Sequence, residues 1–198
     1  VEYELLDLSG ETLLDGESFD FRPGVIPGGE RLVLGTGDTS ASRLEIIDIS
    51  SGETEVETDT ADDWGILDLH PNGDLLAVAS LDGVAQLVVI EPDGTTSVVA
   101  EHEGSVAAVF SGDDVLVHLP SSDDDTLSLA SNVDGAWQLD ELIAAANVTL
   151  YADGSDVSDA WVASAREGDD DGVQLHVATE QGIEVEELRL GAVEASGT

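Results

Sequence analysis

Residues 64–103 read WGILDLHPNGDLLAVASLDGVAQLVVIEPDGTTSVVAEHE, and this stretch decides the fold. Three turn signals divide it into four short segments: Pro71-Asn72-Gly73-Asp74, Asp82-Gly83 and Pro92-Asp93-Gly94. The segment from Leu75 to Ala79 is apolar throughout, which favours a strand covered on both faces. We therefore predict four consecutive strands joined by tight turns.

The same pattern recurs along the chain. The glycines of the turn before the last strand of each unit are separated by 42, 42, 41 and 47 residues, and they are Gly10, Gly52, Gly94, Gly135 and Gly182. A period of about 40 to 50 residues with four strands indicates a β-propeller, which closes radially and leaves only short sheet edges. We predict one all-β propeller domain of four-stranded antiparallel blades. It comprises a half blade at 1–16 and blades at about 17–60, 61–103, 104–146 and 147–192.

Ring closure is open at this point, because about four and a half blades are visible. A chain that starts in mid-blade needs two further strands at its end, and residues 191–198 supply one at most. The chain is a five-bladed ring with one thin blade, a fragment of a larger propeller, or a unit completed by homo- or hetero-assembly. It begins with Val1 and contains no Met, so we expect a processed chain or a part of a longer one.

Three local expectations follow from the residues between the units. Phe19 to Phe21 begins the second unit, Gly35 to Ser42 forms a polar loop, and Leu142 to Ala146 belongs to a strand and the following loop rather than to a helical turn.

The charge balance is extreme. There are 44 Asp and Glu against five Arg and no Lys, a formal charge of −39, while 41% of residues are hydrophobic. Disorder needs low hydrophobicity as well as high charge, so we expect a folded chain with an acidic surface. In molar salt the Debye length falls to about 3 Å, which screens the self-repulsion. The composition resembles that of proteins from salt-in halophiles such as haloarchaea; an acidic secreted protein and an engineered charged one are the alternatives.

Several classes of function are disfavoured by the composition. The five Arg are scattered singly, so no basic patch for nucleic acid is expected. No apolar run approaches about 18 residues, so no membrane span is expected. The chain has no Cys, which excludes disulfides and thiolate chemistry.

Two segments carry a resemblance to a known group. His70 to Ser80 (HPNGDLLAVAS) and Leu87 to Gly94 (LVVIEPDG) resemble the repeats of TolB-like and YVTN-type propellers, a WD40-like group. Leu5 to Gly10 and Ile46 to Gly52 repeat the second half. The resemblance implies the fold and not an activity. It also implies that His102, between two units, orders a turn. Ser131 to Trp137 is similar to the Asp-box of sialidase-type propellers, which shapes a turn.

Acidic loops between the second and third strands of successive units project on one face of a propeller, so we predict the binding face there. Contiguous carboxylates, unlike spaced ones with a Gly, favour solvated loops over a cation site, and no metal is expected. Trp64 stands at the entrance to a first strand and could line such a face, although a place in the core is the alternative. The predicted binding residues are Trp64, Asp38, Asp82, His102, Asp123, Asp124, Asp125, Asp169, Asp170 and Asp171.

Catalytic motifs are missing from the sequence: there is no G-x-S-x-G, no H-E-x-x-H and no phosphate-binding Gly loop. We expect no catalytic residues and no cofactor, and structural roles for His118 and His176. Three hypotheses stay open. The first is a non-enzymatic scaffold that binds a protein or surface polymer, outside the cytoplasm or at the cell surface, with the cytoplasm of a salt-in halophile as the alternative. The second is a carbohydrate-active hydrolase with channel carboxylates, and the third a structural subunit of an assembly.

Overall fold

A computed structural model describes the chain at residues 2–6, 12–17, 24–25, 30–38, 41–145, 147–151, 162–166, 172–179 and 182–189. These residues form eighteen β-strands and contain no helix, so no helix in the described part of the chain could cross a membrane. A hairpin of two strands comes first, and four antiparallel sheets of four strands follow. Each of these four sheets is called a blade below, numbered in chain order.

The strands have the following bounds. The hairpin is formed by β1 (Glu2–Leu6) and β2 (Thr12–Glu17). The first blade comprises β3 (Gly24–Val25), β4 (Arg31–Asp38), β5 (Ala41–Asp48) and β6 (Thr54–Glu57). The second comprises β7 (Asp63–Leu69), β8 (Leu75–Leu81), β9 (Val84–Ile90) and β10 (Thr96–Glu103). The third comprises β11 (Ala107–Ser111), β12 (Asp114–Leu119), β13 (Asp125–Val133) and β14 (Ala136–Ala145). The fourth comprises β15 (Asn147–Tyr151), β16 (Val162–Arg166), β17 (Gly172–Thr179) and β18 (Gly182–Arg189).

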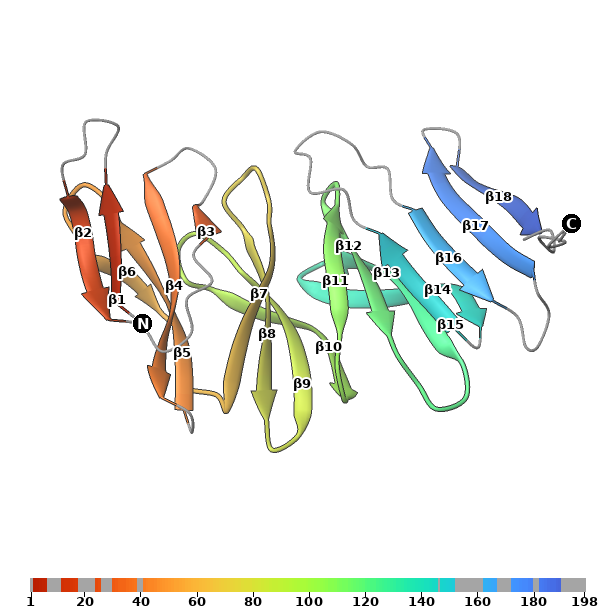
Figure 1. The fold of residues 1–198 in the computed structure, drawn as a ribbon, viewed down its shortest axis with the longest axis horizontal. Helices are drawn as coiled ribbons and strands as arrows, with labels where there is room; N and C mark the ends of the chain where they lie inside the picture. The colour runs from red at the N-terminus through yellow and green to blue at the C-terminus, as the bar shows by residue number, and fades with distance from the viewer. Residues whose placement is uncertain are drawn as a thin grey trace, which may run out of the picture.

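The blades stand side by side in chain order, from the β1–β2 hairpin at one end to β18 at the other (Figure 1). Within each blade every strand pairs with its neighbour in sequence. Alternate connections therefore lie at opposite ends of the blade. We call the end with the β4–β5, β8–β9 and β12–β13 connections the loop face. The end with the β7–β8, β9–β10, β11–β12 and β13–β14 turns is the turn face.

One sequence expectation about the first blade is wrong. Where the structure describes the polar segment from Gly35 to Ser42, it is strand and not loop, because 35–38 lie in β4, 41–42 lie in β5, and Asp38 pairs with Ala41. Backbone groups gain the same ladder hydrogen bonds whatever side chains they carry, so polarity alone did not end the strand. Leu142 to Ala145 lies in β14, as predicted for a strand. Phe19 to Phe21 lies outside the described residues.

The core lies between blades, and the pleat of each inner strand divides its side chains between two neighbours. Leu75 and Ala77 of β8 pack toward the first blade with Val33 and Ile46, whereas Leu76 packs toward the third blade with Val115. Successive side chains of a strand point to opposite faces, so a strand buried on both sides must be apolar without interruption. This is why Leu75 to Ala79 reads as a continuous apolar run.

Carboxylates supplement the apolar contacts between blades. The Asp68 side chain of β7 accepts a hydrogen bond from the backbone nitrogen of Phe110 in the third blade, at 2.9 Å. Asp125 Oδ2 accepts one from the backbone nitrogen of Val148 in the fourth blade, at 3.0 Å. Ser42 and Ala61 exchange backbone hydrogen bonds of 2.8 and 2.9 Å where the first blade meets the second. The first strand of a blade is therefore attached to its predecessor by polar as well as apolar contacts.

Candidate functional site

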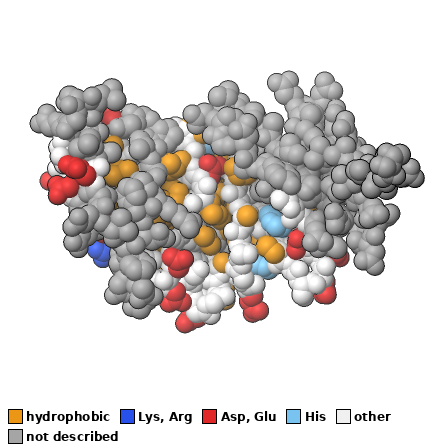
Figure 2. Space-filling model, viewed as in Figure 1, with side chains coloured by type: hydrophobic (Ala, Val, Ile, Leu, Met, Phe, Trp, Pro, Cys, Tyr) orange, Lys and Arg blue, Asp and Glu red, His pale blue; other side chains and the backbone are white. Residues whose placement is uncertain are grey.

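Three of the predicted acidic residues of the loop face, Asp82, Asp123 and Asp124, are exposed. Asp82 occupies the β8–β9 turn with φ of 52°, and its carboxylate is exposed. Asp123 and Asp124 are exposed in the β12–β13 connection, and Asp38 ends β4. Asp and Glu side chains gather along the lower edge of Figure 2, where these connections lie in Figure 1. Asp169, Asp170 and Asp171 lie outside the described residues.

Asp125 belongs to the same acidic run and has a structural role. Its carboxylate accepts hydrogen bonds from the backbone nitrogens of Ser121 and Val148, at 2.9 and 3.0 Å. The bond from Val148, ahead of that from Ser121 and the nearby His118, holds the pKa of Asp125 below its usual 3.8. His118 Nε2 is buried and lies 3.7 Å from Asp125 Oδ2, too far for a hydrogen bond.

The side chains of Trp64 and His102 also make contacts within the chain. The half-buried Trp64 packs against the core between the first and second blades, and its indole nitrogen donates to the Asp59 carbonyl at 3.1 Å. His102 Nε2 lies 2.7 Å from the Pro120 carbonyl oxygen, which links the end of β10 to the β12–β13 connection. The His side chain thus holds a connection in place between two blades.

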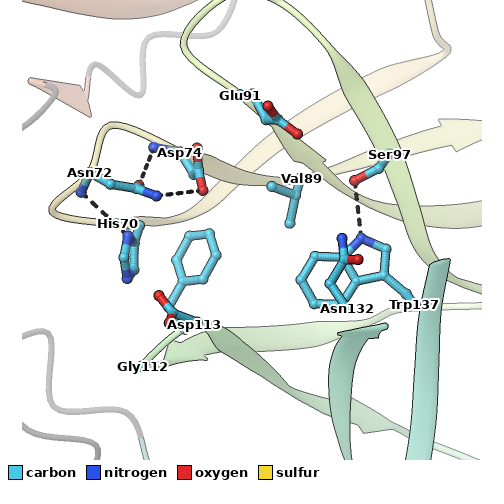
Figure 3. Close-up of a pocket in the computed structure, with 11 residues that line it drawn as sticks. His70, Asn72, Asp74, Val89, Glu91, Ser97, Gly112, Asp113, Asn132 and Trp137 are labelled. Carbon is cyan, nitrogen blue, oxygen red and sulfur yellow. Dashed lines mark hydrogen bonds between the residues drawn. The ribbon is translucent and has the colours of Figure 1, made fainter. Parts of the chain in front are cut away.

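A cavity of about 140 Å³ opens on the turn face between the second and third blades, away from the predicted residues. Its lining comes from the β7–β8, β9–β10 and β11–β12 turns and from strands of both blades, including β13 and β14 (Figure 3). The lining residues are His70, Asn72, Asp74, Val89, Glu91, Ser97, Phe110, Gly112, Asp113, Asn132 and Trp137.

The cavity exists because the outer hairpin of the third blade, formed by β13 and β14, is longer than the outer hairpin of the second blade, formed by β9 and β10. In the second blade Leu75 pairs with Ile90, and the turn begins directly afterwards at Glu91. In the third blade Val115 pairs with Ala130. Beyond Ala130, strands β13 and β14 form three more residue pairs before the β13–β14 turn. This extension places Asn132 and Trp137 beside the second blade.

The turn at the tip of the extension is closely defined. Asp134 and Gly135 have φ of 54° and 84°, the positive values of a type I′ hairpin turn. Asn132 Oδ1 accepts a hydrogen bond from the Gly135 backbone nitrogen at 2.9 Å. Behind the tip, the Trp137 indole nitrogen donates to Ser97 Oγ in the second blade at 3.0 Å, which fixes the indole ring across the blade boundary.

The opposite wall is formed by the β7–β8 turn, which is held by its own side chains. Asn72 Oδ1 accepts from the Asp74 backbone nitrogen at 2.9 Å, and its amide nitrogen donates to Asp74 Oδ2 at 2.8 Å. His70 Nδ1 accepts from the Asn72 backbone nitrogen at 3.3 Å. The His70 ring meets the Phe110 ring edge-on, with centroids 5.0 Å apart and an interplanar angle of 60°.

Two carboxylates at the cavity have no such engagement. Within the described part of the chain, the Glu91 and Asp113 side chains have no hydrogen-bond or ion-pair partner, and both are exposed. Figure 3 shows Glu91 on the second blade and Asp113 on the third, on different sides of the cavity. The arrangement combines flat aromatic surfaces with two available negative charges. It can bind a polar or cationic group.

The sequence predicts a binding face among the loops of the loop face, and this stays a prediction; the turn-face cavity was not predicted. The available signal was Trp137, an aromatic residue directly beyond the Asp134-Gly135 turn of the Ser131 to Trp137 segment. The length of the hairpin relative to its neighbour becomes visible only when the strand registers are known.

Solved structures share this architecture. The β-propeller domain of the trilobed protease from Pyrococcus furiosus matches 91% of this chain and 60% of its own length, with 12% identity and a TM-score of 0.59. The fold is a β-propeller. TolB from Acinetobacter baumannii matches with 14% identity and a TM-score of 0.58, and an acylaminoacyl peptidase from Pyrococcus horikoshii with 14% identity and a TM-score of 0.60.

These neighbours are longer chains, and the match to them is structural. The match to TolB spans 95% of this chain and 48% of TolB. The match to the acylaminoacyl peptidase spans 91% of this chain and 33% of that chain. No protein-family model and no curated protein matches the sequence. The likeness to a TolB-type propeller therefore concerns the fold, with the predicted four-stranded antiparallel blades confirmed.

Proposed function

We propose that the chain is a non-enzymatic β-propeller scaffold that binds a protein, with a surface polymer as the other kind of ligand. The observation that carries the proposal is the turn-face cavity between the second and third blades. Its walls are hairpin turns on paired strands, and a site built on such rigid elements is positioned more precisely than one on long loops.

The lining also has the composition of a recognition site. Ligand sites combine aromatic and apolar surface with a few well-placed polar groups. Here Trp137, Phe110 and Val89 supply the surface, and the Trp137 ring is oriented before any ligand arrives because Ser97 accepts its N–H group. Glu91 and Asp113 supply polar groups that have no hydrogen-bond or ion-pair partner among the residues that the structure describes.

The acidic surface bears on the environment in which this scaffold works and not on the identity of its ligand. A formal charge of −39 is tolerable where salt screens the repulsion, so we place the chain in a halophile such as a haloarchaeon. We place it outside the cytoplasm or at the cell surface, where a protein or polymer partner is accessible.

A retention experiment tests the scaffold proposal. The full chain is immobilised in molar KCl and exposed to extract of its source organism, and bound material is quantified for the wild type, Trp137→Ala and Leu139→Ala. Leu139 lies two residues further along β14, is 40% exposed and is outside the cavity, so its truncation is the matched control. We expect a defined partner that Trp137→Ala loses and Leu139→Ala keeps.

Two results would contradict the proposal. Equal retention by both variants would remove the cavity from the binding surface. Loss of retention in the Asp123→Asn/Asp124→Asn variant alone would return the site to the loop face.

A further inference from the structure

We propose that the turn-face cavity binds the guanidinium group of an arginine side chain presented by a partner protein. This inference rests on the proposed scaffold function and names the chemistry that its site recognises. Three features carry it: two carboxylates without a partner among the described residues, a fixed aromatic wall, and an arginine of this chain that already spans the neighbouring blade boundary.

The carboxylates come from different blades and approach the cavity separately. Glu91 follows β9 in the second blade, and Asp113 lies in the β11–β12 turn of the third. Asp74, the third carboxylate of the lining, is already engaged with the Asn72 amide. Two separated acceptors suit a cation with several N–H donors that point in different directions, as a guanidinium does.

The aromatic wall suits a flat cation. Ser97 holds the Trp137 indole in one orientation, and Trp is the aromatic side chain that interacts best with cations on its face. A guanidinium is planar and weakly hydrated, so it can lie against such a ring, whereas an ammonium is compact and strongly hydrated. The residues described in the structure contain no group of three or more His, Asp or Glu placed to hold a metal ion.

The chain itself shows how a guanidinium bridges two blades. Arg31 directly precedes Leu32, which pairs with Ile47, and Asp74 directly precedes Leu75, which pairs with Ile90. By this register Arg31 of the first blade and Asp74 of the second occupy equivalent positions.

The Arg31 side chain reaches the next blade on this same face. Its Nη1 lies 3.4 Å from the Pro92 carbonyl oxygen of the second blade, while its Nε pairs with Glu55 Oε2 at 2.9 Å. The boundary between the first and second blades therefore contains an internal guanidinium. At the next boundary the equivalent residue is an acid, and the cavity with its two available carboxylates lies there.

Small probes test the inference on the full chain, folded in KCl as verified by circular dichroism. N-acetyl-arginine N-methylamide represents an arginine within a protein, free L-arginine represents a small-molecule ligand, and the citrulline analogue of the amide has nearly the same shape without the charge. The readout is the NMR signal of the Trp137 indole N–H, identified by its loss in Trp137→Phe. We expect a saturable shift with the arginine amide and none with the citrulline amide.

Variants locate the contact. Glu91→Gln and Asp113→Asn should each weaken binding of the arginine amide by up to about fivefold, the contribution of one solvent-exposed ion pair. Asp123→Asn/Asp124→Asn removes two carboxylates from the loop face and should leave binding unchanged. Equal weakening by all of these variants would mean that only the overall charge matters and would overturn the inference.

The remaining outcomes separate this inference from the scaffold proposal. If the citrulline amide binds as tightly as the arginine amide, the positive charge has no role in recognition. If free L-arginine binds more tightly than the arginine amide, the ligand is a small molecule and not an arginine of a partner protein. If no probe binds but a partner from the extract still depends on Trp137, the guanidinium inference fails and the scaffold proposal stands. If neither probe nor partner depends on Trp137, both fail.

Discussion

The Asp68 carboxylate accepts a hydrogen bond from the backbone nitrogen of Phe110, 42 residues further along the chain, at 2.9 Å. The first residue lies in the first strand of the second blade, and the second lies in the first strand of the third. Substitution of Asp68 by Ala leaves the part-buried Phe110 amide without its acceptor, so we expect a loss of about 1.5–3 kcal/mol in the free energy of unfolding. Chemical denaturation at constant salt measures it. Asp63→Ala, in the exposed first position of β7, removes the same charge and should change stability far less; equal losses would contradict a specific bond.

Asp125 should make stability depend on pH in the acid range. Its pKa is lower in the folded chain than the usual 3.8, first because Val148 donates a backbone hydrogen bond to it. The ionised carboxylate therefore stabilises the fold above about pH 3.8, and this contribution disappears as the pH falls through the folded-state pKa. We expect Asp125→Asn to lower the free energy of unfolding at neutral pH. In this variant the free energy of unfolding should also fall less steeply as the pH is lowered into the acid range. Denaturant titrations from about pH 6 to about pH 3 test this. An unchanged profile in Asp125→Asn, or an equal change in the exposed Asp124→Asn, would contradict it.

Gly135 should be required for the outer hairpin of the third blade. Its φ of 84° is unfavourable for residues with a Cβ, yet a Cβ at this position would meet no atom within 4 Å. Gly135→Ala should therefore destabilise the protein through backbone strain alone, by about 1–2 kcal/mol. Asp134→Gly is the matched variant, because glycine accepts its φ of 54° without strain and should not destabilise through φ. Thermal unfolding of both variants tests this prediction. A Gly135→Ala protein as stable as the wild type would argue against this turn conformation.

Salt should control folding. With a formal charge of −39, lowering the ionic strength lengthens the Debye length from about 3 Å in molar salt to about 10 Å at about 0.1 M and exposes the carboxylates to one another. We expect the β-sheet signal in circular dichroism to weaken as KCl is removed and to return when it is restored. Sucrose, which does not screen charge, should restore it less well. A fold that persists unchanged at low salt would rule out the proposed adaptation to a halophile.

The inner strands were predictable from the sequence because burial on both sides demands an unbroken apolar run, as at Leu75 to Ala79. The blade period was predictable from turn glycines whose conformation only glycine adopts easily, such as Gly52 and Gly94, which have φ of 70° and 89°. The extent of β4 and β5 was not predictable from the sequence. Their pairing runs from Arg31 with Asp48 to Asp38 with Ala41, and it is made by backbone groups whatever the side chains are.

The candidate site was less accessible to sequence reasoning. Acidic loops drew the prediction to Asp82 and Asp123, yet in a chain this acidic carboxylates carry little information about position. The informative residues were Trp137 and Ser97, which come from different blades and meet only after folding. A cavity that depends on the length of one hairpin relative to its neighbour has no signature in either hairpin alone.

The alternation of side chains along β8 has a consequence for rebuilding this protein. Leu76 fits one neighbouring blade while Leu75 and Ala77 fit the other, so the two faces of a blade are shaped for different partners. A single blade transplanted into another propeller would bring two mismatched surfaces with it. Two adjacent blades moved together would keep their shared interface, and with it the turn-face cavity. The smallest transferable module of this chain is therefore a pair of blades.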